Sequence, residues 1–133
     1  MSIKTIDIWK TITQTGNTSH LTDIIHEEAI FYSPIVYTPQ KGKNKVLKYL
    51  HTAVKTFKGN NFQYLNNTYI TKSFFFAEFT ANINDIEING VDIIKCDFGL
   101  IKEFKVLIRP LKGLEVVWNE MKLNLEKYDH HLS

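Results

Sequence analysis

Asp92 is the residue of this sequence whose surroundings most favour acid–base chemistry. It stands within the apolar, β-branched run 86–96, which is typical of a β-strand. Successive side chains of a strand point to opposite faces, so Asp92 shares a face with Ile94 and lies opposite Lys95. If the lysine faces water, the carboxyl faces an apolar interior, where burial raises its pKa and suits it to proton transfer. The alternative is a structural carboxylate that accepts hydrogen bonds from a bulge or a neighbouring strand.

Aromatic side chains could line a pocket beside such a carboxyl. Tyr32 and Tyr37 flank a loop containing Pro34 and are the best candidates for a pocket mouth. Aromatic residues at helical or strand spacing also build ordinary core, so that alternative stays open for each. The ligand-binding candidates of this class are Tyr32, Tyr37, Trp9, Phe57 and Trp118.

Two further charged residues lie on predicted strands. Arg109 is the only arginine and could donate a fixed pair of hydrogen bonds to a ligand carboxylate. It could equally pair with an acidic residue or a backbone carbonyl at the end of the sheet. Glu78 shares a face with Phe76 and is expected on the outer face, paired with a lysine across strands.

Metal and nucleophilic chemistry find little support in the residue spacing. We find no histidine that shares one face at ligand spacing with another histidine or an acidic residue, including His130 and His131 near the end of the chain. The single cysteine, Cys96, has no histidine close by in sequence and is interpreted as a small core residue. We therefore expect neither a metal nor a cofactor.

Length and composition limit the classes of protein that the chain can represent. Its 133 residues predict one domain over 1–133, and 44% apolar with 23% charged residues is an ordinary globular balance. A net charge of +2 gives no indication of a nucleic-acid or membrane surface. Without a signal-like apolar start or a disulfide framework, a cytoplasmic protein is expected.

The first half of the chain is predicted to be helical. An apolar arc from Ile3 to Ile12 predicts a helix that Gly16 ends. A short helix is expected around residues 21–25, followed by a brief strand at Phe31 and Tyr32. Apolar residues at helical spacing from 46 to 57 predict an amphipathic helix.

The second half changes to strand patterns and ends in a helix. Four runs rich in aromatic and β-branched residues predict an antiparallel meander, at 62–70, 73–83, 86–96 and 100–109. Gly90 predicts a bulge within the third run. Pro110 begins a final amphipathic helix. The expected fold class is α+β: a curved antiparallel sheet of about four long strands plus a short one, packed on N-terminal helices, with a C-terminal helix.

Two stretches carry a resemblance to a known family. They are 31–50, beginning Phe31-Tyr32-Ser33-Pro34, and 88–111, ending Ile108-Arg109-Pro110-Leu111. Together they resemble the nuclear-transport-factor-2-like superfamily, in its SnoaL-like branch of small bacterial proteins. The resemblance implies a cone-shaped α+β barrel, frequent homodimers and a pocket at the open end. Members include ketosteroid isomerases, polyketide cyclases and epoxide hydrolases, so the fold alone does not give the reaction.

The chemistries that the resemblance implies fit this sequence unequally. The isomerases pair a tyrosine donor with acidic residues, but no tyrosine here stands in a matching motif. The epoxide hydrolases use an Asp–Arg–Asp relay, and Arg109 at a strand end argues against that reaction. The cyclases pair an aspartate with a histidine; Asp92 is the nearest match in position, and no histidine lies on the predicted strands.

Three functions are consistent with these residues. The leading hypothesis is a binding protein whose pocket holds a small apolar or carbonyl-containing molecule. The second is a proton-transfer enzyme, an isomerase or cyclase, with Asp92 as general base, which needs a second polar group beside it. The third is a dimeric scaffold with a filled cone. Because aromatics crowd both faces of the run 74–79, we also expect a homodimer through the outer face of the sheet.

Overall fold

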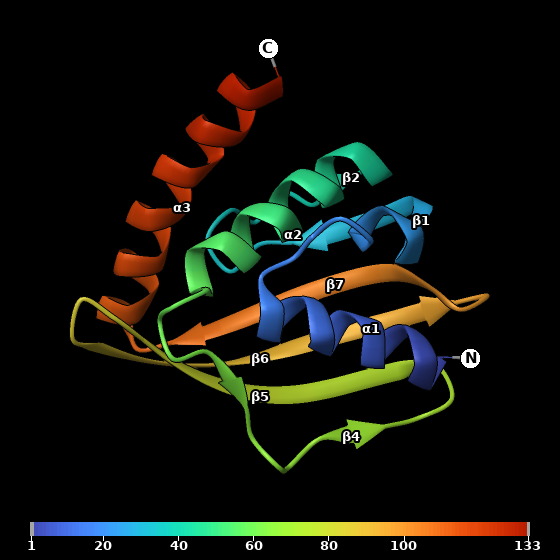
Figure 1. Cartoon of the computed structure of the whole chain (residues 1–133). Helices are drawn as coiled ribbons and strands as arrows, with labels where there is room; N and C mark the ends of the chain where they lie inside the picture. Colours follow the sequence, from blue (N-terminus) through green and yellow to red (C-terminus); the bar gives the residue numbers. More distant parts are fainter. Residues whose placement is uncertain (1, 133) are drawn as a thin grey trace.

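The computed structural model describes residues 2–132, and the side chains of residues 3–129. The chain folds into helices on one face of a curved sheet, with a long helix at the end of that sheet (Figure 1). In chain order the elements are α1 (Ser2–Thr15), the 3-10 helix η1 (Leu21–Ile24), β1 (Ile25–Tyr32), β2 (Gln40–Lys41), α2 (Lys43–Phe57), β3 (Gln63–Tyr64), β4 (Tyr69–Ile70), β5 (Phe74–Ile83), β6 (Ile86–Asp97), β7 (Leu100–Arg109) and α3 (Leu111–Leu132).

The sheet has seven strands in the order β2-β1-β7-β6-β5-β3, with β4 also paired to β5. β5, β6 and β7 form the predicted antiparallel meander, and the α+β class with a C-terminal helix is confirmed. The expected strand over 62–70 is instead two short strands, β3 and β4. β1 is longer than expected, and it runs parallel to β7.

The predicted bulge at Gly90 is wrong; the glycine instead allows close packing. It pairs in regular register with Phe79 on β5 and Ile108 on β7. A Cβ at this position would lie 2.4 Å from Cζ of Phe79 and 2.5 Å from the backbone oxygen of Leu107. The irregularity between β6 and β7 lies between Lys95 and Cys96. Glycine is therefore required here because the Phe79 ring crosses the backbone of β6.

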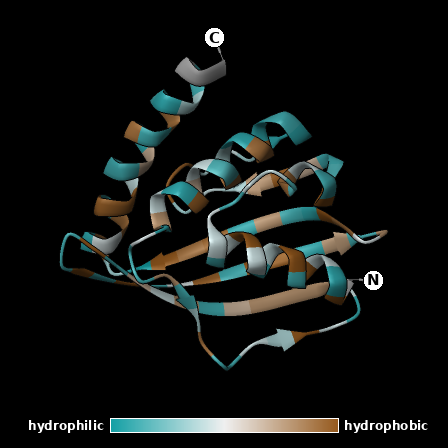
Figure 2. Ribbon diagram, viewed as in Figure 1, coloured by the Kyte–Doolittle hydropathy of each residue, from teal (hydrophilic) through white to brown (hydrophobic). Residues whose placement is uncertain are grey.

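Figure 2 shows hydrophobic and hydrophilic residues interspersed along the strands and helices. The inner face of the sheet packs on α1 and α2 through a large cluster that includes Ile6, Leu50 and Ile94. A second cluster, centred on Phe79 and Val117, joins the sheet to α3. Burial of these side chains supplies the main driving force for folding. Within residues 2–132, no helix combines the length and the apolar character needed to cross a membrane.

Candidate functional site

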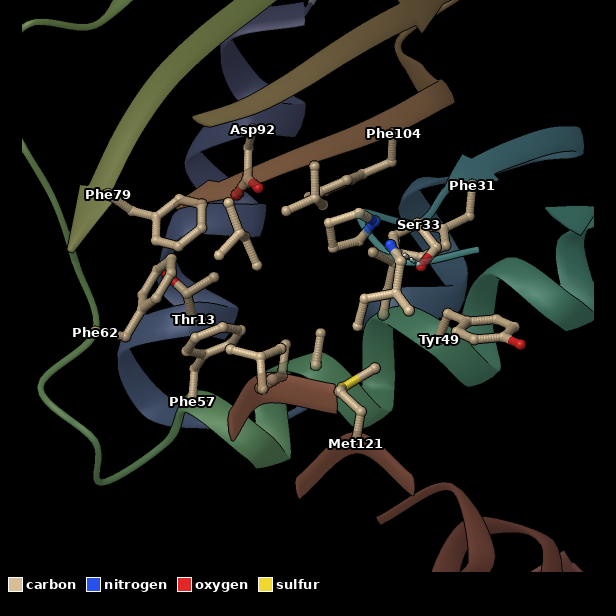
Figure 3. Close-up of a pocket in the computed structure, with 18 of the residues that line it drawn as sticks. Thr13, Phe31, Ser33, Tyr49, Phe57, Phe62, Phe79, Asp92, Phe104 and Met121 are labelled. Carbon is tan, nitrogen blue, oxygen red and sulfur yellow. Dashed lines mark hydrogen bonds between the residues drawn. The ribbon is translucent and has the colours of Figure 1, made fainter. Parts of the chain in front are cut away.

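A cavity of about 70 Å³ lies between the inner face of the sheet and the three α-helices (Figure 3). Its walls are mostly aromatic and aliphatic, which makes the interior strongly apolar. Each long strand and each α-helix of the cone contributes to the wall. The aromatic part of the lining includes Trp9, Phe31, Phe57, Phe62, Phe79 and Phe104.

Asp92 is the acidic side chain of this wall. It lies in the middle of β6, where it pairs with Ala77 on β5 and Val106 on β7. The residue is 4% exposed, and its carboxyl points into the cavity (Figure 3). The inward orientation predicted from strand alternation is thus correct, as Ile94 is buried while Lys95 is half-exposed.

A chain of hydrogen bonds connects three elements behind this carboxyl. The indole N–H of Trp9 on α1 donates to the hydroxyl of Tyr64 on β3, over 2.8 Å. The Tyr64 hydroxyl donates in turn to Oδ2 of Asp92. Tyr64 faces inward because β3 pairs it with Phe79, an inner-face residue of β5. The arrangement places a hydrogen-bond donor at one carboxyl oxygen and fixes the direction of the other.

Burial changes the acidity of both groups. It raises the pKa of Asp92 to about 7, although the hydrogen bond from Tyr64 opposes this shift by stabilising the carboxylate. Burial, with the negative charge of Asp92, raises the pKa of Tyr64 well above its usual value. Tyr64 therefore keeps its proton and acts as a donor, while Asp92 changes charge near neutral pH. This is the range in which a carboxyl can both take and return a proton.

The second oxygen of Asp92 is accessible from the cavity. Among the described residues, the hydrogen bond from Tyr64 reaches Oδ2, and no partner is found for Oδ1. No fully buried side-chain oxygen or nitrogen in this part of the chain lacks a partner. Oδ1 is therefore accessible, and the residue lines the cavity. It can accept a hydrogen bond as a carboxylate or donate one as an acid.

The predicted ligand-binding residues divide into two groups. Trp9, Phe57 and Trp118 line the cavity. Tyr32 lies outside it, on the opposite side of β1 from the buried Phe31, with the ammonium of Lys105 over its ring at 4.8 Å.

Tyr37 and Arg109 also lie outside the cavity, and their predicted places near the ligand need correction. Tyr37 is 99% exposed, because the loop turns its ring outward before β2 joins the sheet. The part of this loop that does line the cavity is 33–35. Arg109 is exposed at the end of β7 and donates over 3.3 Å to the side-chain oxygen of Asn89. Arg109 thus has the structural role expected at the end of the sheet, but its partner is the side-chain amide of Asn89 and not an acidic residue or a backbone carbonyl.

Glu78 lies on the outer face, as predicted, but its partners are amides and not a lysine. Its two oxygens accept hydrogen bonds from Asn67 and Asn89, at 2.6 and 2.8 Å. These bonds lower the pKa of Glu78. The carboxylate therefore belongs to a polar network on the outer surface and not to the cavity.

Tyr64 is the functional candidate that sequence reasoning missed. It stands two residues after Phe62 in a predicted strand, and this spacing places both rings on one face. The signal was therefore present, but the partner of Tyr64 lies on a strand 28 positions further along the chain. Its hydroxyl is a second polar group beside Asp92, and its proton is donated to that carboxyl.

The donor set offers no metal site in the described part of the chain. No three histidine, cysteine or acidic side chains gather there in a way that could hold an ion. The side chains of His130 and His131 lie outside the described residues. Cys96 is buried, as its assignment to the core requires.

Similarity to known proteins lies in the three-dimensional structure. No family model and no curated protein matches the chain. A steroid delta-isomerase from Pseudomonas aeruginosa has 28% sequence identity and a TM-score of 0.89, over 96% of this chain and 93% of that one. A bacterial protein with a cystatin-like fold from Silicibacter pomeroyi has 23% identity and a TM-score of 0.85, over 96% and 89% of the two chains.

A third structure extends the similarity to lower identity. A nuclear-transport-factor-2-like protein of unknown function from Mesorhizobium loti has 15% identity and a TM-score of 0.73, over 82% of this chain and 91% of that one. The chain therefore has the fold of the nuclear-transport-factor-2-like superfamily.

Proposed function

We propose that this protein binds a small, mostly apolar molecule in the cavity and orients it by a hydrogen bond to Oδ1 of Asp92. The observation that carries the proposal is a single accessible carboxyl oxygen in a mostly apolar, partly enclosed space. Apolar walls with a few placed polar groups are typical of small-molecule sites. The walls supply affinity, and the carboxyl supplies orientation.

The unfilled volume favours a binding protein over a scaffold. A scaffold needs no internal space, since empty volume costs stability that a larger side chain would restore. The space of about 70 Å³ exceeds the roughly 10–15 Å³ that one water molecule requires. It is smaller than the roughly 300–1,000 Å³ of typical ligand pockets. A compact ligand with few non-hydrogen atoms therefore suits it better than a polycyclic one.

Filling the cavity tests this proposal. Ala53 on α2 lines the cavity, so Ala53→Leu should occupy the space while keeping a good helix former. Lys45→Leu places the same side chain on the exposed side of α2 and serves as the matched control. Ligand-observed NMR with small apolar compounds should detect binding by the wild type and the control, and not by Ala53→Leu. Equal binding by all three proteins would place the ligand elsewhere and contradict the proposal.

Proton transfer is a second candidate, favoured by the pairing of Asp92 with Tyr64. A carboxyl with a pKa of about 7 can act as general base at neutral pH, and a bound ligand would meet it on the cavity side. The similar protein from Pseudomonas aeruginosa is a steroid delta-isomerase, and isomerisation of that kind moves a proton. The substrate class would be a compact carbonyl compound with an acidic hydrogen beside the carbonyl.

Hydrogen–deuterium exchange next to the carbonyl of small ketones in D₂O measures this activity without knowledge of the natural substrate. The wild type should accelerate exchange, and Asp92→Asn should remove about 100-fold or more of that acceleration, as expected for loss of a general base. An exchange rate equal to that in buffer, for ketones that NMR shows to bind, would reject the enzyme and leave the binding protein.

A further inference from the structure

We propose that the cavity selects ligands carrying a cationic amine, held between the carboxylate of Asp92 and the surrounding aromatic rings. This inference rests on the proposed function, since it specifies which small apolar molecule the cavity takes. Four features of the cavity wall support this proposal. The donors near Asp92 are hydrogen-bonded within the protein, and the remaining donors lie away from it. The wall contains no cationic side chain, and aromatic rings lie on the same side as Asp92.

The donors closest to Asp92 are consumed within the protein. The Trp9 indole N–H donates to Tyr64 over 2.8 Å, and the Tyr64 hydroxyl donates to Asp92. The Thr13 hydroxyl, also in the wall, donates to the backbone oxygen of Lys10 over 2.7 Å. The two hydroxyls therefore have only lone pairs left to offer a ligand, and the indole, which carries no acceptor, has no free proton. A wall of acceptors favours a ligand that brings its own donors.

The remaining polar groups of the wall lie away from the carboxyl. Ser33 accepts backbone N–H groups from Ile35 and Val36, and its own proton is a donor left to the cavity. Figure 3 places Ser33 at the side of Tyr49, while Asp92 lies at the side of Phe79. The hydroxyl of Tyr49 points away from the cavity in the same view.

The indole of Trp118 is the other side chain of the wall with an N–H that could serve a ligand. It belongs to α3, with the ammonium of Lys122 over its ring at 5.4 Å. Asp92 belongs to β6, across the sheet–helix space.

The wall contains no positive charge to accompany the carboxylate. Of the described residues that line the cavity, none is lysine, arginine or histidine. A buried carboxylate without a counterion is costly, so an ammonium group in the cavity would be strongly favoured. The ammonium group of the ligand would supply the positive charge that the cavity wall lacks. A neutral carbonyl ligand would leave this charge uncompensated whenever Asp92 is ionised.

Aromatic rings next to Asp92 can stabilise the same cation. Phe57, Phe62 and Phe79 pack with ring centres 5.1 to 5.9 Å apart and at different tilts. All three rings line the cavity, and Figure 3 shows them along the side where Asp92 lies. A cation over a ring face is attracted by the negative charge of the π system. Carboxylate and rings together form a site for an alkylammonium group.

The charge of the site follows the ionisation of Asp92 alone. Tyr64 is the titratable group that faces it from β3, and that group keeps its proton. α1 presents Trp9 and Thr13, while the paired strands present Ala77 and Val106, none of which is charged. α2 contributes one titratable lining group, the tyrosine hydroxyl that points away, and α3 contributes apolar side chains and an indole. Burial holds the pKa of Asp92 near 7, so the carboxylate is available at neutral pH.

Matched compounds separate an amine site from a site for neutral molecules. Cyclohexylamine is compared with cyclohexanol and cyclohexanone, and isobutylamine with isobutanol, by NMR titration of the wild type at pH 5.5 and 8. Members of a set have nearly the same shape, so their difference reports charge. At pH 8 the amines should bind about tenfold or more tightly than the neutral compounds, as expected for a charge-assisted hydrogen bond. Their affinity should rise from pH 5.5 to 8, whereas that of the ketone should not.

Two variants complete the test. Asp92→Asn should lose the tenfold preference for amines and the pH dependence of amine binding. Asp97→Asn, the same change on the same strand but outside the cavity, should behave as the wild type. The pH series needs only the wild type, so poor folding of Asp92→Asn would leave the proposal testable.

The possible failures are distinguishable. Equal or weaker binding of the amines than of the ketone would overturn the amine site and leave the proposed binding function intact. Binding of no compound from either set at millimolar concentration would overturn both.

Discussion

Replacing Asp92 by asparagine should make the stability of the folded protein depend much less on pH. The carboxyl has a pKa of about 7 in the folded protein and about 4 in an unfolded chain. The folded protein thus binds this proton more tightly than the unfolded chain. The stabilisation from the neutral carboxyl is complete below pH about 4 and is lost as the pH rises to about 7. Asparagine has nearly the same shape but cannot titrate.

The size of the effect follows from the two pKa values. They differ by about three units, and one unit corresponds to about 1.4 kcal/mol, so ionisation of Asp92 should cost the folded state about 4 kcal/mol. This is an upper limit, because Oδ1 borders a cavity that water can enter. Even half of it is a large part of the stability of a small domain.

Urea unfolding of both proteins at pH values from 4 to 8 measures this effect. Taking the difference between the unfolding free energies of wild type and Asp92→Asn cancels the other titrating groups. That difference should shift by 2 to 4 kcal/mol, roughly, in favour of the variant as the pH rises. A difference that stays constant within about 1 kcal/mol would falsify the burial of an ionisable carboxyl in the cone. Tyr64 does not interfere, because it keeps its proton over this range.

Three other changes test neighbouring parts of the structure. Tyr64→Phe removes the hydrogen bond that stabilises the carboxylate, so the carboxyl ¹³C signal of Asp92 should titrate above pH 7; an unchanged or lower midpoint would argue against the bond. Gly90→Ala should lower the free energy of unfolding by about 1–3 kcal/mol or more, because its Cβ meets the Phe79 ring and a backbone oxygen; a neutral result in urea unfolding would contradict that contact. Sedimentation equilibrium should detect a homodimer at micromolar concentration that Ile93→Lys on the outer face dissociates, and a wild-type monomer would reject the dimer.

Local patterns in the sequence predicted most of the fold. The orientation of Asp92 followed from the alternation of a strand in which Lys95 had to face water, and the amphipathic helix at 46–57 followed from apolar spacing. The parallel pairing of β1 with β7 could not be predicted in this way, because it joins segments 70 or more positions apart. Gly90 was assigned to a bulge because a sequence does not show that the ring of another strand crosses above it.

The site itself depends on contacts that local patterns do not contain. Trp9, Tyr64 and Asp92 come from a helix, a two-residue strand and the longest strand, and each has an ordinary explanation when taken alone. Only the closure of the sheet around α1 brings the indole, the hydroxyl and the carboxyl into one line of hydrogen bonds. Aromatic residues such as Tyr37 look equally suitable in the sequence, yet its loop turns it to solvent. Whether an aromatic residue lines the cavity or faces solvent depends on how its strand or loop is oriented. That orientation is set by pairing between strands far apart in the sequence. For that reason strand alternation could predict the orientation of Asp92, whereas its partner Tyr64, which belongs to no recognisable motif, could be found only in the structure.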